Sequence, residues 1–339
     1  MLGYVIRRCF IGLVMVIVMS LVTFLLFFAS PVDPARYACG KSCDENTREM
    51  ARKSLGYDQP VMVQWGQFMK GLVVGREYPV DPELRATMNE DQITECAAPC
   101  LGYSVYNNKT VNESISEAFP VSASLAVAAI IMWLLGGILL GVLAAVTRGS
   151  PLDRGIVALA LVAYAFPSFF IGTFLIRYVS LKWGLFPFPE YTPIAEGGVG
   201  EWALNLFLPG LTLALLFMAG YIRMTRAFVL ESMSEDYVRT ARAKGLAGRR
   251  VLFKHSLRAS LTPLVTMAGL DFAAVLGGAV ITETVFNYNG LGKLAVTANA
   301  TFDLPVLIGL VLLLGSIVII ANIIVDILYA FIDPRVRVG

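Results

Sequence analysis

The feature that most constrains this chain is a set of six long apolar stretches, five of which contain no charged residue. A helix that crosses the hydrocarbon core of a membrane needs about 20 mostly apolar residues. Because that core offers backbone groups no water, continuous runs of this length predict membrane-spanning helices. The six predicted spans are residues 9–32, 118–147, 155–176, 202–222, 259–282 and 304–325, and only 259–282 carries a charge, at Asp271.

Composition agrees with this reading and excludes several classes of protein. Hydrophobic residues make up 57% of the chain and charged residues 15%, whereas a soluble domain has about 45–50% and about 25%. A soluble globular enzyme, a disordered chain and a fibrous repeat are therefore excluded. The net charge of +2 gives no support for a nucleic-acid partner. The only histidine is His255, which excludes a histidine-rich metal site.

The distribution of Lys and Arg predicts the orientation of the spans, because short cytoplasmic loops are enriched in both. If the N-terminus is cytoplasmic, the inner segments hold Arg7, Arg8, Arg148, Arg154, nine basic residues between 223 and 258, Arg335 and Arg337. The short outer loops then hold only Arg177, Lys182 and Lys293. We therefore expect an all-α multi-pass membrane protein of six transmembrane helices with both termini in the cytoplasm. Gly137 and Gly141 have the spacing of a close helix contact.

A polar insert follows the first predicted helix. Residues 33–117 hold 13 Asp and Glu against 9 Lys and Arg, and we expect them to form a small extracytoplasmic module. The chain then divides into 1–32 (N-terminus and first helix), 33–117 (outer module) and 118–339 (a five-helix core with a cytoplasmic loop at 229–258).

Four of the five cysteines lie in this insert, as Cys39, Cys43, Cys96 and Cys100. An even number of cysteines on the oxidising side of a membrane predicts disulfides. If both pairs lie on helical turns, Cys39 would pair with Cys100 and Cys43 with Cys96, although a glycine and a proline within the pairs argue against regular helix. A four-cysteine zinc or iron–sulfur site and free thiols remain as alternatives.

The loop at 229–258 reads as a short amphipathic helix followed by a basic segment. Ser232 and Glu235 have the spacing of a capping box at its start, and Gly245 is a natural stop at its end. Ala241 and Ala243 are small enough to let another surface approach closely. The alternative is a basic loop that lies on anionic lipid.

The sequence of this loop resembles a known family. Asp236-Tyr-Val-Arg-Thr-Ala-Arg-Ala-Lys-Gly-Leu246 is similar to the cytoplasmic loop of ATP-binding-cassette importer permeases, specifically the first (B-type) permease of the dipeptide, oligopeptide and nickel branch. The resemblance extends along nearly the whole chain. It includes Tyr4-Val-Ile-Arg-Arg8, residues 46–60, residues 277–292 and residues 326–335, whereas the outer cysteines and Asp271 have no counterpart.

The resemblance implies a type I importer permease in the bacterial cytoplasmic membrane that forms half of a translocation pathway. Its loop would be a coupling helix that docks on an ATPase subunit. The implied coupling residues are Asp236, Tyr237, Arg239, Thr240, Ala241, Ala243, Lys244 and Gly245. The implied partners are a homologous second permease, two ATPase subunits or one fused ATPase, an extracytoplasmic substrate-binding protein and membrane lipid.

The chain itself lacks an energy-supplying site. No stretch matches Gly-x4-Gly-Lys-Ser/Thr, the loop that binds nucleotide phosphates. We therefore expect no catalytic residues, metal or cofactor in this chain, with ATP and Mg bound by the partner ATPases.

Asp271 requires an explanation, because a charge in a span costs about 2.5–3.5 kcal/mol. It either lines the substrate pathway, where it would meet a peptide's N-terminal amine, or lies hydrogen-bonded at a partner interface. A rival hypothesis is an ion- or proton-coupled secondary transporter that uses Asp271 and Asp326. Nickel chelates and glutathione are alternative substrates to dipeptides and oligopeptides within the resemblance.

Overall fold

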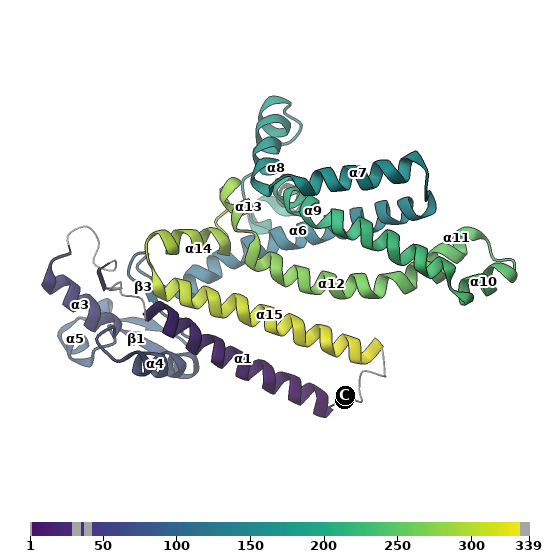
Figure 1. Cartoon of the computed structure of the whole chain (residues 1–339). Coiled ribbons are helices and arrows are strands. Elements are labelled where there is room, and N and C mark those ends of the chain that lie inside the picture. Colours follow the sequence, from purple (N-terminus) through teal and green to yellow (C-terminus); the bar gives the residue numbers. More distant parts are fainter. Residues whose placement is uncertain (1, 29–34, 37–42, 333–339) are drawn as a thin grey trace. The chain divides into compact units, whose positions relative to one another are not determined.

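The computed structural model describes residues 2–28, 35–36 and 43–332 (Figure 1). Within these residues the regular structure is mostly helical, and the strands are short. The chain divides into two compact units, which are Met1–Pro120 with Asn289–Gly339 (unit 1) and Val121–Tyr288 (unit 2). The C-terminal helix thus groups with the first helix and the outer insert, whereas the sequence-based division placed it with the core of 118–339.

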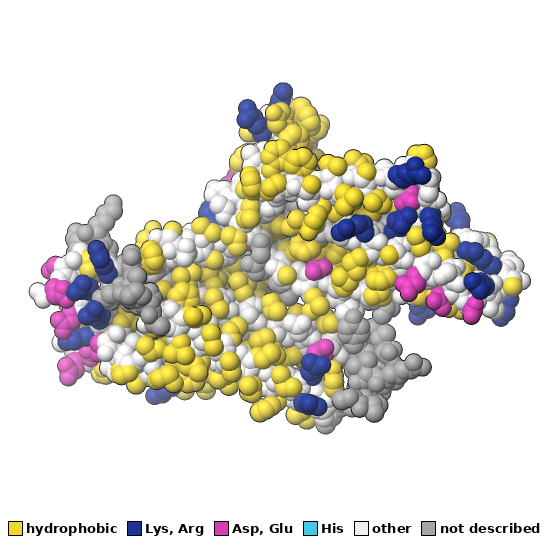
Figure 2. All heavy atoms as spheres, viewed as in Figure 1, with side chains coloured by type: hydrophobic (Ala, Val, Ile, Leu, Met, Phe, Trp, Pro, Cys, Tyr) yellow, Lys and Arg dark blue, Asp and Glu magenta, His cyan; other side chains and the backbone are white. Residues whose placement is uncertain are grey.

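Two long apolar helices lie along each other in unit 1. They are α1 (Leu2–Phe28) and α15 (Leu304–Ile332), and Figure 1 shows them side by side. Apolar side chains cover the visible surface of both helices in Figure 2. The helices approach closely at Gly12, where a Cβ atom would lie only 2.7 Å from Cδ1 of Ile323. This pair has the composition of spans that face lipid on one side and each other on the opposite side.

Between α1 and α6, unit 1 carries a small module of short helices and strand pairs. Its elements are α3 (Glu45–Leu55), α4 (Val61–Val74), β1 (Arg76–Tyr78), α5 (Pro82–Thr87), η1 (Glu90–Gln92), β2 (Thr94–Cys96), β3 (Tyr103–Ser104) and β4 (Lys109–Thr110). Strand β1 pairs antiparallel with β2, and β3 with β4. Helix α3 begins where the Asp44 carboxylate accepts a hydrogen bond from the Thr47 amide at 2.9 Å. The structure therefore shows a folded module where the sequence predicted one.

Cys96 and Cys100 form a disulfide within this module, with their Cα atoms 5.4 Å apart. The suggested cross-pairing of Cys43 with Cys96 and Cys39 with Cys100 is therefore wrong. It assumed helical turns, but Cys96 ends strand β2 and Cys100 lies in the turn that follows. Cys43 is also disulfide-bonded, and Cys39 lies outside the described residues.

The start of α6 (Val111–Val146) packs with α14 (Leu291–Ala300) and α15 to form an apolar core in unit 1. A capping box starts α6: the Glu113 amide donates to Thr110 Oγ1 and the Thr110 amide to Glu113 Oε2, both at 3.2 Å. The buried members of the core are Val111, Ile115, Ala118, Leu291, Ala298, Val306 and Leu310.

Unit 2 contains the rest of α6 and a series of helices. These are α7 (Pro151–Ala165), α8 (Ser168–Phe174), η2 (Leu175–Lys182), α9 (Ile194–Ser234), α10 (Asp236–Ala243), α11 (Gly248–Arg250), η3 (Val251–Ser256), α12 (Leu257–Gly278) and α13 (Val280–Val285). Helix α9 packs against both α7 and α12. It is therefore the central helix of this unit.

Four of the predicted spans are continuous helices, and two are bent. The helices long and apolar enough to cross a membrane, within the described part of the chain, are Gly3–Phe28, Val111–Val146, Ile194–Ser234 and Leu304–Ile327. The other two stretches are the pairs Pro151–Ala165 with Ser168–Lys182, bent by 100°, and Gly248–Leu261 with Pro263–Leu276, bent by 45°. Pro167 explains the larger bend, because it lacks an N–H and disfavours helical geometry at Phe166, whose φ and ψ are −86° and 135°.

The predicted contact at Gly137 and Gly141 is confirmed as a contact between α6 and α9. A Cβ atom at Gly137 would lie 2.5 Å from Cβ of Tyr221, and one at Gly141 would lie 2.8 Å from the carbonyl oxygen of Ile222. Both distances are shorter than side chains tolerate. The absence of side chains at these two positions therefore sets how closely α9 packs on α6.

Replacing Gly137 with Ala is expected to destabilise unit 2 by about 1–3 kcal/mol, because the added methyl group must displace Tyr221. The measurement is thermal unfolding of the purified protein in detergent. The matched control is Gly220→Ala in α9, where nothing lies within 4 Å of the new Cβ atom. There the better helix propensity of Ala should stabilise by up to about 1 kcal/mol. Equal effects of both substitutions would contradict the packing argument.

Candidate functional site

The candidate site is the short helix α10 with its flanking residues. Helix α9 ends at Ser234, Glu235 adopts an extended conformation with φ −70° and ψ 151°, and α10 begins at Asp236. The predicted capping box of Ser232 and Glu235 is wrong, because Ser232 still belongs to α9 and Glu235 makes no side-chain cap. A single non-helical residue therefore separates the central helix of unit 2 from α10.

One face of α10 is buried within unit 2. Val238 is 0% exposed and Ala241 is 5% exposed, and both pack with Val251 of η3 and with Leu246. Ala241 was expected to leave room for a partner surface, but it faces this internal contact. Its small size lets α10 pack closely on the segment that leads to α12.

Hydrogen bonds connect α9, α10 and η3 behind this apolar contact. The hydroxyl oxygens of Ser232 and Tyr237 lie 2.5 Å apart, and Ser232 Oγ also donates to the carbonyl oxygen of Ser256 at 3.2 Å. Ser256 Oγ in turn donates to the carbonyl oxygen of Val229 at 3.4 Å. Sequence reasoning missed the role of Ser232 and Ser256, because their partners are 24 and 27 residues away in the chain.

The C-terminal end of α10 follows the sequence prediction. Gly245 has a φ of 76°, in the left-handed region that favours glycine, and α10 ends at Ala243. The Leu246 amide then donates to the carbonyl oxygen of Ala241 at 3.3 Å, which turns the chain back toward η3. Gly245 is thus confirmed as the residue that stops this helix.

The opposite face of α10 is exposed and carries charges of both signs. Arg239 Nη1 lies 3.4 Å from Asp236 Oδ1, and both side chains are largely in solvent, so the pair adds little stability. Figure 2 shows Lys and Arg side chains gathered around the end of unit 2 that carries α10 and α11. The exposed candidates are Asp236, Tyr237, Arg239, Thr240, Ala243, Lys244 and Gly245. Helix α10 is thus anchored on one face and exposed on the other.

Asp271 lies in α12 and is partly exposed. It accepts a hydrogen bond from the hydroxyl of Tyr221 in α9 at 2.6 Å. The Tyr221 ring is buried beside Trp133 of α6, with ring centroids 6.3 Å apart. The structure thus brings Asp271 together with aromatic side chains of two other helices, and not with the residues of α10. Asp326, the second acid of the rival hypothesis, pairs with Arg8 in unit 1 at 2.9 Å.

Two further acids of unit 2 were missed by sequence reasoning. Asp153 is 4% exposed and receives two hydrogen bonds from Arg226, at 2.7 and 2.8 Å, and one from the Gly149 amide. Glu283 is 0% exposed and accepts a hydrogen bond from Ser122 at 2.6 Å. Because the partners are 73 and 161 residues away, no local pattern could have identified them.

Within the residues that the structure describes, no group of three or more His, Cys, Asp or Glu side chains could hold a metal ion.

Replacing Ala241 with Leu is expected to loosen α10, because the larger side chain cannot fit against Val251. Overpacking of this kind costs about 1–3 kcal/mol, so trypsin should cleave faster after Arg239 and Arg242. The matched control is Ala243→Leu on the exposed face, which should leave the cleavage rate unchanged. Limited proteolysis of the purified chain checks both. Equal protection of the two variants would show that Ala241 is not an anchoring residue.

Comparison with known proteins agrees with this geometry. A family described as binding-protein-dependent transport system inner membrane component matches residues 137–338, and its N-terminal counterpart matches residues 1–126. A Brucella abortus protein, provisionally named as a peptide transport system permease, is 36% identical over 99% of both chains. The glutathione transport system permease protein GsiC of Escherichia coli is 34% identical over 99% of both chains.

A solved structure of the MetNI methionine ABC transporter in an inward-facing conformation is 20% identical, covers 64% of this chain and 96% of that chain, and has a TM-score of 0.48. The family assignment depends on the sequence matches alone, which span almost the full length. The chain belongs to the binding-protein-dependent inner-membrane components, the permease subunits of ATP-binding-cassette importers, and is a multi-pass inner-membrane protein without an ATPase site of its own.

Proposed function

We propose that this permease subunit imports peptides. The observation that carries the proposal is the full-length similarity, at 36% and 34% identity, to proteins named for peptide and glutathione transport. Glutathione is itself a small peptide, so both names point to one chemical class of substrate. Glutathione remains the alternative substrate within this class, because the similarity to GsiC extends over 99% of this chain.

The bent helix pairs count as single spans in this proposal, which gives six crossings with both termini in the cytoplasm. Support comes from the basic residues, which gather in the segments that this orientation places inside. The module of α3 to β4 then lies outside, where its disulfide is stable. The loop that carries α10 lies inside, on the side where ATP is available.

In this proposal α10 is the coupling helix that docks on an ATPase subunit. Its exposed residues form the contact, and its buried residues Val238 and Ala241 transmit the displacement. A homologous second permease completes the pathway, and two ATPase subunits, separate or fused, bind ATP and Mg. A substrate-binding protein delivers peptide from outside. ATP binding and hydrolysis then switch the pathway between outward-open and inward-open states, each favoured by different contacts.

Asp271 is proposed to line the pathway and to attract the N-terminal amine of a peptide. Its carboxylate is partly exposed and accepts a hydrogen bond from the hydroxyl of Tyr221. The rival hypothesis of ion-coupled transport loses support, because Asp326 is paired with Arg8.

Replacing Ala243 with Trp is expected to abolish peptide-stimulated ATP hydrolysis by the assembled complex, because the indole blocks entry of α10 into its cleft. Protection of α10 from trypsin should stay unchanged, since Ala243 is exposed. The matched control is Ala86→Trp on the exposed surface of α5, which should retain activity. Full activity of the Ala243 variant would refute docking through this face.

A series of di- to pentapeptides tests the substrate class. Peptides should stimulate ATP hydrolysis by the reconstituted complex with its binding protein, and stimulation by glutathione alone would favour the alternative.

In the same reconstituted complex, uptake of labelled peptides tests Asp271. The Asp271→Asn variant should transport free-amine peptides about tenfold more slowly, the effect of losing one charge-assisted hydrogen bond. N-acetylated peptides should be transported equally by both proteins. An equal loss for both peptide classes would mean that Asp271 is structural.

A further inference from the structure

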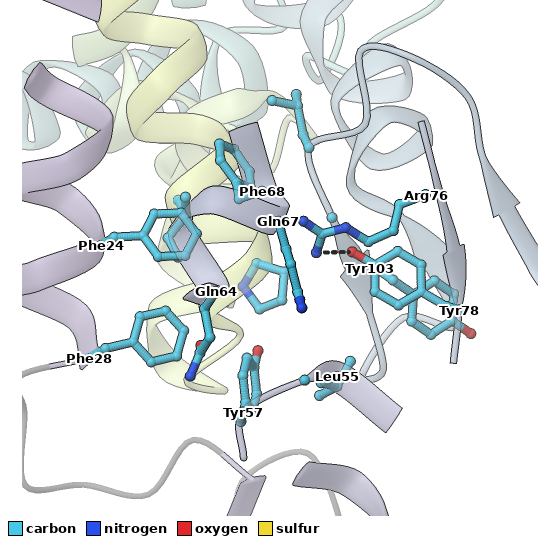
Figure 3. A pocket seen from close by; sticks show the side chains of 15 residues that line it. Phe24, Phe28, Leu55, Tyr57, Gln64, Gln67, Phe68, Arg76, Tyr78 and Tyr103 are labelled. Carbon is cyan, nitrogen blue, oxygen red and sulfur yellow. Dashed lines mark hydrogen bonds between the residues drawn. The ribbon is translucent and has the colours of Figure 1, made fainter. Parts of the chain in front are cut away.

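Unit 1 contains a cavity that the permease function does not use. Its volume is about 50 Å³, and it lies between α1, α4, β1 and the start of α15. Phe24, Phe28 and Phe68 form an apolar wall, and the opposite wall is formed by the stacked rings of Tyr78 and Tyr103 (Figure 3). One water needs about 10–15 Å³ by this kind of measure. The cavity therefore has room for the end of a molecule rather than for a whole peptide.

Arg76 supplies the only charge among the lining residues that the structure describes. Its Nη1 donates to the hydroxyl of Tyr78 at 3.2 Å, whereas its Nη2 is buried and has no hydrogen-bond partner in the described part of the chain. A buried donor without a partner is unfavourable, and more so when it is charged. The nearby carboxylate of Asp303 lies outside this lining and accepts a hydrogen bond from Ser104. The described lining thus contains a cationic donor and no anion.

The backbone around Arg76 holds this side chain in place. Gly71 lies under the guanidinium, since a Cβ atom there would be 3.3 Å from Nε of Arg76. The carbonyl oxygen of Gly71 accepts hydrogen bonds from the amides of Gly75 at 2.9 Å and Cys100 at 3.1 Å. Gly75 has a φ of 83° and passes so close to Cys96 that no larger residue fits. The disulfide turn and the end of α4 therefore fix where β1 begins and where Arg76 points.

Further polar groups converge on the same space. Figure 3 shows the Tyr57 hydroxyl and the Gln67 amide pointing toward the region next to the guanidinium. Burial raises the pKa of Tyr57 far above its ordinary value, so its hydroxyl stays protonated and can donate. Burial also raises the pKa of Tyr78. The side chains around the free Nη2 therefore offer N–H and O–H donors.

We propose that this cavity binds the carboxylate of an apolar carboxylic acid, with Arg76 and Tyr57 as donors and the three phenylalanines around the apolar group. One guanidinium balances one carboxylate, whereas a phosphate monoester dianion would keep an uncompensated charge among aromatic rings. Two sources share this chemistry, namely the C-terminal residue of a peptide and a short acyl chain.

The test is a ligand-observed NMR titration of the full chain in phospholipid nanodiscs. N-acetyl-leucine represents the peptide source and hexanoate the acyl source, and each is compared with its uncharged amide. At least one acid should bind about tenfold or more tightly than its amide, because the amide loses a charge-assisted contact. Which acid shows the preference identifies the source. Equal binding of acid and amide in both pairs, or no binding by either acid, would overturn the proposal.

Substitutions locate the site. Arg76→Gln should remove the preference for the acid, whereas Lys70→Gln, which removes the same charge from the exposed side of α4, should keep it. If the Arg76 variant does not fold, the Tyr57→Phe variant tests the site instead. It removes one hydrogen-bond donor and leaves the charge of Arg76 in place. A severalfold loss of acid affinity in Tyr57→Phe supports the site. Unchanged acid affinity in that variant, or a preserved acid preference in a folded Arg76→Gln protein, would refute it.

Discussion

The structure depends on one constraint, that polar groups within a membrane must find partners inside the protein because lipid offers none. Four acidic side chains of unit 1 and unit 2 receive a hydrogen bond or an ion pair from a side chain of a different helix. The pairs are Asp153 with Arg226, Asp271 with Tyr221, Glu283 with Ser122 and Asp326 with Arg8. These bonds join helices that apolar packing alone would leave free to slide.

Helix α10 is both exposed and firmly held. Its buried side chains, Val238 and Ala241, meet Val251 just before the chain enters α12, and Tyr237 contacts Ser232 of α9. Ser232 and Ser256 add hydrogen bonds between α9 and η3. A displacement of α10 would therefore reach α9 and η3 through packed atoms and hydrogen bonds, as the proposed coupling role requires.

Sequence patterns predicted the features that depend on neighbours in the chain. The apolar runs located the helices, and Gly245 marked the end of α10 because a left-handed conformation is a local property. Patterns failed where the outcome depends on the tertiary fold. The inward direction of Ala241 depends on its contact with Val251. The disulfide joins Cys96 to Cys100, only four residues on, because Cys96 ends β2 and Cys100 follows in a turn, where helical turns were assumed. The sharp bend next to Pro167 was missed because the apolar run continues through it.

The acids of unit 2 differ in how much of their hydrogen-bonding capacity is used. This difference bears on which acid is suited to the proposed substrate pathway. Asp153 receives two bonds from a guanidinium and one from a backbone amide, so its charge is balanced internally. Glu283 is fully enclosed and out of reach of any substrate. Asp271 is partly exposed and accepts a hydrogen bond from the hydroxyl of Tyr221, and no cationic side chain pairs with it among the described residues. A carboxylate can accept about four hydrogen bonds. Of these three acids, Asp271 therefore fits best the proposed role of receiving a cationic group from a moving substrate.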